Sequence, residues 1–123
     1  RTNKKGINQF KDIIERFGYE VIPIVLDEML HLKTGAAYLG DDILLTAGEM
    51  KEKPEFQNYE IIEISEQEKY AANCVCVNGK VIMAEGYPKT LELIEERGFK
   101  TETVDVSEFK KLDGGISCLS LRL

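Results

Sequence analysis

The sequence has few of the features that mark membrane or secreted proteins. It contains no tryptophan, a single histidine, three prolines and three cysteines among 123 residues. No apolar run approaches the roughly 20 residues that a membrane-spanning helix needs, and no basic segment leads into an apolar signal sequence. Because three cysteines are an odd number without disulfide-framework spacing, we expect free thiols and a cytoplasmic protein.

The charge of the chain excludes further classes of partner. The formal net charge is -6 at pH 7, and Lys and Arg form no cluster. Because binding to phosphates requires a concentrated basic surface, we expect neither nucleic acid nor an anionic membrane as a partner. A small cationic or zwitterionic ligand fits this charge better.

A helix followed by three strands is expected to recur along the chain. Apolar residues keep helical spacing after Thr2 and Asn3, either of which can cap the helix, and Gly18 can end it. Hairpin turns are expected at Gly40-Asp41-Asp42 and at Asn78-Gly79. The expected helices are 3–17, 49–57 (interrupted by Pro54) and 88–97, and the expected strands are 19–26, 36–39, 43–46, 59–64, 74–77, 81–84, 99–106 and 116–121. The fold class is therefore α/β, in the broad sense that includes α+β.

This order of elements has a period of about 40 residues. A shift of the sequence by 80 positions aligns Gly18 with Gly98, Tyr19 with Phe99, Glu28 with Glu108, Met29 with Phe109 and Gly35 with Gly115. Two complete units and most of a third are expected, as in proteins built from stacked supersecondary units. The alternative is an ordinary α+β domain in which the similarity is coincidental.

The single histidine is the first candidate for chemistry. His31 stands between Leu30 and Leu32, and taken alone it is more typical of a satisfied core histidine than of a catalyst. The repeat places the segments that hold His31 and Cys118 in equivalent positions of two units. If the units surround an axis, both residues can therefore face one central site.

Cys118 is the second candidate. It falls in the expected strand 116–121, where it shares a face with Ser120, and an inert buried thiol is the alternative. The preceding Asp113-Gly114-Gly115 allows tight backbone conformations and leaves room for a ligand beside the thiol. A cysteine beside a histidine is a recurring arrangement for attack on an electrophilic carbon.

The other cysteines and the acidic residues are expected to be structural. Cys74 and Cys76 share a strand face, but a lone C-x-C lacks the ligand count of a zinc site, so no metal is expected. The glutamates of the middle unit have no fixed pairing pattern and are expected on the solvated surface. They are Glu60, Glu63, Glu66 and Glu68.

Five segments match a known family. They are Arg1-Thr2-Asn3, Leu30-His31-Leu32-Lys33-Thr34-Gly35, Tyr70-Ala71-Ala72-Asn73-Cys74, Gly86-Tyr87-Pro88-Lys89-Thr90 and Leu112-Asp113-Gly114-Gly115-Ile116-Ser117-Cys118-Leu119-Ser120. Through these segments, and over its whole length, the chain resembles dimethylarginine dimethylaminohydrolases. The resemblance implies part of a five-bladed α/β propeller, the pentein fold. Residues 1–123 would be the C-terminal portion of its single catalytic domain, and the N-terminal portion is expected to precede Arg1.

The resemblance also implies roles for individual residues. Cys118 would be the nucleophile, His31 the general acid/base, and Arg1 the ligand of the substrate α-carboxylate. Asp113 and Leu112 would contact the guanidinium and amino-acid ends of the substrate. The carboxylates that assist the histidine and grip the guanidinium lie in the family's N-terminal half, which would complete the site in cis or as a second chain. A homo-oligomer is left open.

The implied reaction is hydrolysis of Nω-methylated arginine to citrulline and dimethylamine. A guanidinium carbon is a poor electrophile, so carboxylates must polarise it while a thiolate attacks and forms a thiouronium adduct. No metal or organic cofactor is implied, and the isolated fragment is expected to be inactive. Two alternatives stay open: a related activity such as arginine deiminase or amidinotransferase, and a non-catalytic half that acts as an assembly partner.

Overall fold

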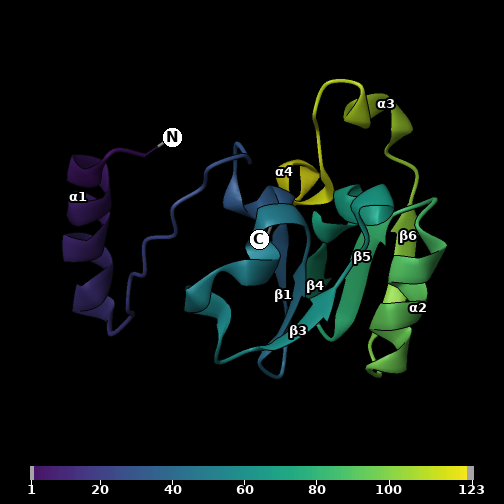
Figure 1. Cartoon of the computed structure of the whole chain (residues 1–123), viewed down its shortest axis with the longest axis horizontal. Coiled ribbons are helices and arrows are strands. Elements are labelled where there is room, and N and C mark those ends of the chain that lie inside the picture. Colours follow the sequence, from purple (N-terminus) through teal and green to yellow (C-terminus); the bar gives the residue numbers. More distant parts are fainter. Residues whose placement is uncertain (1, 122–123) are drawn as a thin grey trace.

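Two small sheets of the same construction form the centre of the structure (Figure 1). In this computed structural model, which describes residues 2–121, one sheet contains β1 (Ala36–Gly40), β2 (Ile43–Thr46) and β3 (Glu60–Glu63), and the other contains β4 (Val75–Val77), β5 (Lys80–Ala84) and β6 (Lys100–Val104). In each sheet the first two strands are antiparallel and the third runs parallel to the second. The two sheets confirm that the chain repeats, but the predicted unit of a helix followed by three strands is divided differently: each sheet combines a hairpin with the strand that follows the next helical segment.

The two predicted hairpin turns are confirmed, and their residue types explain them. Asp41 and Asp42 have φ of 49° and 57°, and Asn78 and Gly79 have φ of 52° and 72°. Positive φ at both central residues gives a turn whose twist matches that of the strands, and Asn, Asp and Gly tolerate this backbone better than other residues do.

The helices are short, and several have 3-10 geometry. They are α1 (Lys4–Ile14), η1 (Glu15–Phe17), η2 (Leu32–Thr34), η3 (Gly48–Glu52), η4 (Pro54–Phe56), η5 (Glu66–Ala72), α2 (Pro88–Glu96), α3 (Ser107–Lys110) and α4 (Ile116–Leu119). The expected helix 49–57 is split into η3 and η4, because Pro54 has no backbone N–H and holds Lys53 in an extended conformation. No helix within residues 2–121 has the length and apolar character needed to cross a membrane.

The ends of α1 and α2 follow the predicted capping residues. Asn3 Oδ1 accepts the N–H of Gly6 at 2.9 Å, and Gly18, with φ of 81°, ends the last turn after α1. Pro88 opens α2, and Gly98, with φ of 83°, follows its end.

Two predicted strands are wrong. Residues 19–26 form an irregular segment that joins α1 to the sheets (Figure 1), since no strand within the described residues pairs with them. Residues 116–119 form α4, so the prediction that Cys118 and Ser120 share a strand face fails. In this helix the Gly115 carbonyl accepts the N–H groups of Cys118 and Leu119, and Asn73 Oδ1 caps the N–H of Ser117.

One apolar core joins the two sheets. It includes Leu39, Leu45, Ile64, Val81, Met83 and Ile94, and β1 contacts β4 across it. All four residues of β2 are buried, because the opposite face of the first sheet packs on a second cluster. That cluster contains Leu44, Met50 and Phe56 and holds the segment with Ile24, Leu26 and Met29. Three strands bury too little surface alone, so each unit depends on its neighbours.

The prediction that the glutamates of the middle unit lie on the surface is wrong for Glu68. Glu60, Glu63 and Glu66 are exposed, whereas Glu68 is only 8% exposed. Its Oε2 accepts the N–H and the hydroxyl of Thr90, each at 2.7 Å. Burial raises the pKa of Glu68, but the hydrogen bonds from Thr90 and the Lys89 N–H outweigh burial and leave the pKa below its ordinary value. Glu68 thereby fastens η5 to the start of α2.

We expect the first turn of α2 to loosen at acid pH. The folded state lowers the pKa of Glu68. The ionised carboxylate therefore stabilises the fold at neutral pH, and this contribution is lost as the pH falls through the lowered pKa. Glu68→Gln should weaken the turn by about 2 kcal/mol at neutral pH and reduce this pH dependence. Hydrogen exchange at the Leu91 amide measures both effects. Glu66→Gln, at an exposed position, is the control, and equal effects of the two substitutions would contradict the assignment.

Candidate functional site

His31 lies at the surface rather than in the core. It is exposed, its backbone is extended, and its carbonyl accepts the N–H of Thr34 at 3.1 Å as η2 begins. The alternative interpretation of a satisfied core histidine is therefore wrong. The imidazole remains accessible for chemistry.

The segment that leads to His31 is held by one carboxylate. The two oxygens of Glu49 accept the N–H groups of Asp27, Glu28 and Met29 at 2.9, 2.9 and 2.6 Å. These backbone hydrogen bonds, that of Asp27 first, lower the pKa of Glu49 to about 2. The carboxylate is therefore ionised throughout the physiological range and fixes three consecutive amides just before His31.

Packing holds the same segment from the side. The Met29 side chain lies against two glycines, and a Cβ built on Gly35 would overlap its sulfur. A Cβ on Gly48 would come within 2.5 Å of the Met29 methyl carbon, and Gly48 also has a φ of 54°. Lys53 adds an ion pair with Glu49 at 3.1 Å.

Cys118 lies in α4, at the end of a segment that is tied to η5. Its side chain is exposed, and the residues just before it carry the ties. The Tyr70 hydroxyl donates to the Gly114 carbonyl, and Asn73 Oδ1 accepts the Ser117 N–H at 2.9 Å. The buried Ile116 packs on the second sheet. The expectation that an isolated cysteine is buried and inert does not describe Cys118.

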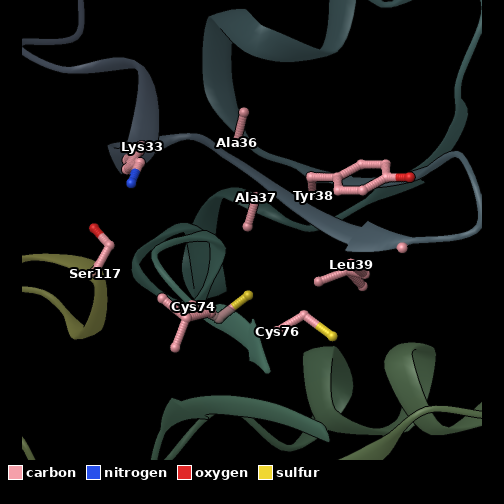
Figure 2. A pocket seen from close by; sticks show the side chains of 10 residues that line it. Lys33, Ala36, Ala37, Tyr38, Leu39, Cys74, Cys76 and Ser117 are labelled. Carbon is pink, nitrogen blue, oxygen red and sulfur yellow. The ribbon is translucent and has the colours of Figure 1, made fainter. Parts of the chain in front are cut away.

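The two segments meet at one end of a cavity of about 440 Å³ between β1 and β4. Figure 2 shows Lys33, two residues after His31, and Ser117, one residue before Cys118, at the same end of this cavity. Ala37 and Leu39 of β1 line one wall, and Cys76 of β4 lines the opposite wall together with Cys74, the residue just before that strand. The fold thus brings Lys33 and Ser117, which stand close in sequence to the two candidates, to one cavity, whereas His31 and Cys118 themselves are not among its lining residues.

A second, larger hollow of about 700 Å³ lies between α1 and residues 21–26. His31 lines it together with Thr2, the residue next to Arg1. The prediction for Arg1 concerns a residue outside the described part of the chain. Its described neighbour nevertheless borders the same space as His31.

The other two predicted substrate contacts, Leu112 and Asp113, lie in an exposed turn. Leu112 is 87% exposed, and Asp113 has a φ of 58°. Their N–H groups donate to the carbonyls of Phe109 and Lys110. Within residues 2–121, neither Leu112 nor Asp113 lines either of the two cavities. The structure therefore does not place them beside His31.

Sequence reasoning missed three residues that support the site: Glu49, Tyr70 and Asn73. Tyr70 and Asn73 stand in one of the matched segments, so the sequence marked them, but it indicated no role for either residue. Glu49 carried no signal, because its partners are backbone amides that lie 20 to 22 residues earlier.

The comparisons with known proteins agree on one family. No protein-family profile matches the chain. It is 52% identical over 122 residues to N(G),N(G)-dimethylarginine dimethylaminohydrolase of Pseudomonas aeruginosa, a match that covers 99% of this chain and 48% of the relative. It is 32% identical over 125 residues to the Streptomyces coelicolor protein of the same name, with 100% and 47% covered. The chain spans about half the length of the curated relatives it matches.

Solved structures give the same result. A cysteine-to-serine variant of the Pseudomonas aeruginosa enzyme, complexed with citrulline, has a TM-score of 0.95 and 51% identity, and the match covers 100% of this chain and 48% of that chain. A histidine-to-glycine variant of a dimethylarginine dimethylaminohydrolase, solved as an adduct with S-methyl-L-thiocitrulline, gives the same values. An amidinotransferase of saxitoxin biosynthesis from Microseira wollei shares the fold alone. Its TM-score is 0.77 at 17% identity, and the match covers 98% of this chain and 38% of that chain.

The thiols of Cys74 and Cys118 should differ sharply in reactivity. Burial raises the pKa of Cys74 to about 12, whereas Cys118 is exposed. Because the thiolate is the reactive form, iodoacetamide should modify Cys118 at least about 100-fold faster than Cys74 in the folded protein. Peptide mapping by mass spectrometry measures both rates, and Cys118→Ser should remove the fast reaction. Equal rates at the two cysteines would show that the fold does not protect Cys74.

Proposed function

We propose a function for this chain, which belongs to the dimethylarginine dimethylaminohydrolase family. It carries the nucleophile Cys118 and the general acid/base His31 of an enzyme that hydrolyses Nω-methylated arginine to citrulline and dimethylamine. The observation that carries the proposal is the meeting of their two segments at one end of a cavity, through Lys33 and Ser117. Both candidate side chains are exposed, and both segments are fixed by side chains from elsewhere in the fold.

The related structures support these two roles. The replaced histidine and the replaced cysteine of the two variants are separated by the same number of residues as His31 and Cys118. One related structure holds citrulline, which is the product of the proposed reaction, and another holds an adduct with S-methyl-L-thiocitrulline, which is an analogue of its substrate. Matching residues in this chain would perform the same chemistry.

The reaction would proceed in two steps. The Cys118 thiolate attacks the guanidinium carbon and forms a C–S bond, and the C–N bond to dimethylamine breaks as His31 protonates the departing nitrogen. Neutral His31 then takes a proton from water, the hydroxide adds to the same carbon, and the C–S bond breaks as the added hydroxyl loses its proton to solvent and becomes the urea carbonyl. Citrulline leaves, and the thiolate is restored.

The remaining predicted residues would bind the substrate. Arg1 would form a bidentate contact with the α-carboxylate, because a planar guanidinium matches its two oxygens. Thr2 and His31 line the same hollow, which supports a place for Arg1 near the site. Leu112 and Asp113 would contact the substrate from their exposed turn.

The rest of the site would come from the N-terminal half of a five-bladed propeller, in cis or as a second chain. Residues 19–26 follow α1 as β6 follows α2, but within the described residues they have no partner strand. No residue of α1 is buried, and its Phe10 and Ile13 are more than half exposed. An apolar face and an unpaired segment support burial against further units. Two cysteines that are not in disulfides, Cys74 and Cys118, support the proposal of a reducing, cytoplasmic compartment.

A related activity on unmethylated arginine is the second candidate. The N-terminal domain of a cyanobacterial arginine dihydrolase, solved with bound substrate, has a TM-score of 0.77 and 27% identity over 99% of this chain and 48% of that domain. Comparison of citrulline release from dimethylarginine and from arginine by the complete protein separates the two activities.

Replacement of either proposed catalytic residue should stop turnover without unfolding the protein. In the complete protein, Cys118→Ser and His31→Ala should each lower kcat for dimethylarginine by roughly a thousandfold or more, because each removes a reacting group. Both side chains are exposed, so the thermal transition should change little. Glu66→Gln, at an exposed position that lines neither cavity, is the control that retains activity. Normal citrulline release by Cys118→Ser would exclude the assigned nucleophile.

The chain alone should be inactive and should self-associate or unfold easily. The exposed apolar face of α1 favours aggregation, and the carboxylates that would hold the guanidinium are supplied by the other half. Addition of the N-terminal half as a separate chain should restore a cooperative thermal transition and citrulline release. Light scattering and a citrulline assay on the mixed halves measure this. An active, monodisperse monomer of the 123-residue chain would contradict the half-site.

A further inference from the structure

We propose that Asn73 is the positioning residue for Cys118: its side-chain amide fixes the first turn of α4 and thereby the place of the nucleophile. This inference rests on the proposed function, because it assigns a purpose to a contact beside the proposed nucleophile. Asn73 is separated from Ser117 by 44 positions, so the contact is not a local consequence of the helix.

The contact is close and has two parts. Asn73 Oδ1 accepts the Ser117 N–H at 2.9 Å, and Ser117 is the second residue of α4. The N–H groups of a first helical turn have no partner within the helix, so this oxygen acts as an N-cap supplied from elsewhere in the chain. The rest of the amide lies against Gly115, where a built Cβ would come within 2.5 Å of Asn73 Cγ. Only glycine at position 115 allows this approach.

A helix as short as α4 does not hold its own position. It spans four residues, and isolated helices of that length are unstable in water. The Cys118 N–H donates only locally, to the Gly115 carbonyl at 3.0 Å. The ties that locate α4 are the Asn73 amide, the Tyr70 hydroxyl on Gly114 and the buried Ile116. Of these three ties, the Asn73 amide holds the residue nearest in sequence to Cys118, which is Ser117.

Asn73 itself has a rigid base. Its N–H donates to the Tyr70 carbonyl at 3.1 Å, and the residue as a whole is only 8% exposed. Its neighbours Ala72 and Cys74 belong to the core that joins the two sheets. A continuous path therefore leads from the core through Asn73 to Ser117 and then to Cys118.

Loss of this tie should affect geometry rather than the thiol itself. Attack on a guanidinium carbon requires the sulfur at a defined distance and angle, and a displacement of about 1 Å can cost about 100-fold in rate. A small alkylating reagent reaches an exposed thiol from many directions. Asn73→Ala should therefore lower turnover while alkylation of Cys118 is little changed.

The test compares three variants of the complete protein. Asn73→Ala removes the acceptor, and Asn73→Asp keeps an oxygen that can accept the Ser117 N–H. Thr90→Ala is the matched control, because it removes another buried side-chain hydrogen bond, between Thr90 and Glu68, without contacting α4. For each variant we would measure kcat and KM for dimethylarginine, the iodoacetamide rate at Cys118, the thermal midpoint, and hydrogen exchange at the Ser117 amide.

The expected result is specific to the position of Asn73. Asn73→Ala should lower kcat about 100-fold with KM within threefold of wild type, keep the alkylation rate within twofold, and speed exchange of the Ser117 amide at least tenfold. Asn73→Asp should restore slow exchange and part of kcat. Thr90→Ala should lower the thermal midpoint and leave kcat within threefold.

Two outcomes would overturn the proposal. If Asn73→Ala leaves exchange at Ser117 unchanged, the anchor does not exist, whatever the turnover. If Thr90→Ala lowers kcat as much as Asn73→Ala does, the effect is general destabilisation. A wild-type protein without citrulline release would instead refute the proposed function, since alkylation and exchange report on the anchor without any substrate.

Discussion

The structure depends on side-chain oxygens that satisfy backbone amides outside regular secondary structure. Most of the chain between the strands is loop or short 3-10 helix, where N–H groups have no ladder partner. Glu49 binds three such amides before His31, Glu68 binds those at the start of α2, and Asn73 binds that of Ser117. An N–H left without a partner and without water costs roughly 1–3 kcal/mol, so these acceptors decide which loop conformations persist.

These acceptors also join the parts of each repeated unit. In the first unit a carboxylate on η3, after the hairpin, holds the segment before the hairpin, through Glu49 and residues 27–29. In the second unit the direction is reversed, since Glu68 lies before the hairpin and holds the start of α2 after it. Each three-stranded sheet thus gains a cross-connection that its few strand hydrogen bonds do not supply. The shared core between β1 and β4 then fixes the units relative to each other.

The sequence predicted those parts of the fold that local chemistry determines. The turns at Asp41-Asp42 and Asn78-Gly79 and the ends of α2 follow from residues within a few positions. Prediction failed where a distant partner decides the outcome. Residues 19–26 have the composition of a strand but no partner to pair with, and residues 116–119 alternate like a strand but become helical under the Asn73 cap. The burial of Glu68 likewise depends on Thr90, which lies 22 positions away. His31 and Cys118 were found through motifs, whereas their supports became visible only in three dimensions.

The same distant contacts explain how one chain can keep two cysteines in opposite states. Cys74 is buried in the core with a raised pKa, and Cys118 is exposed on a short helix at the edge of that core. A nucleophile must stay accessible, so burial cannot hold it in place. It must instead be located through its backbone, and backbone groups are located by hydrogen bonds. Asn73 stands next to the buried Cys74 in sequence and reaches the residue before Cys118 in space, so a single amide transmits the rigidity of the core to a thiol that the core does not cover.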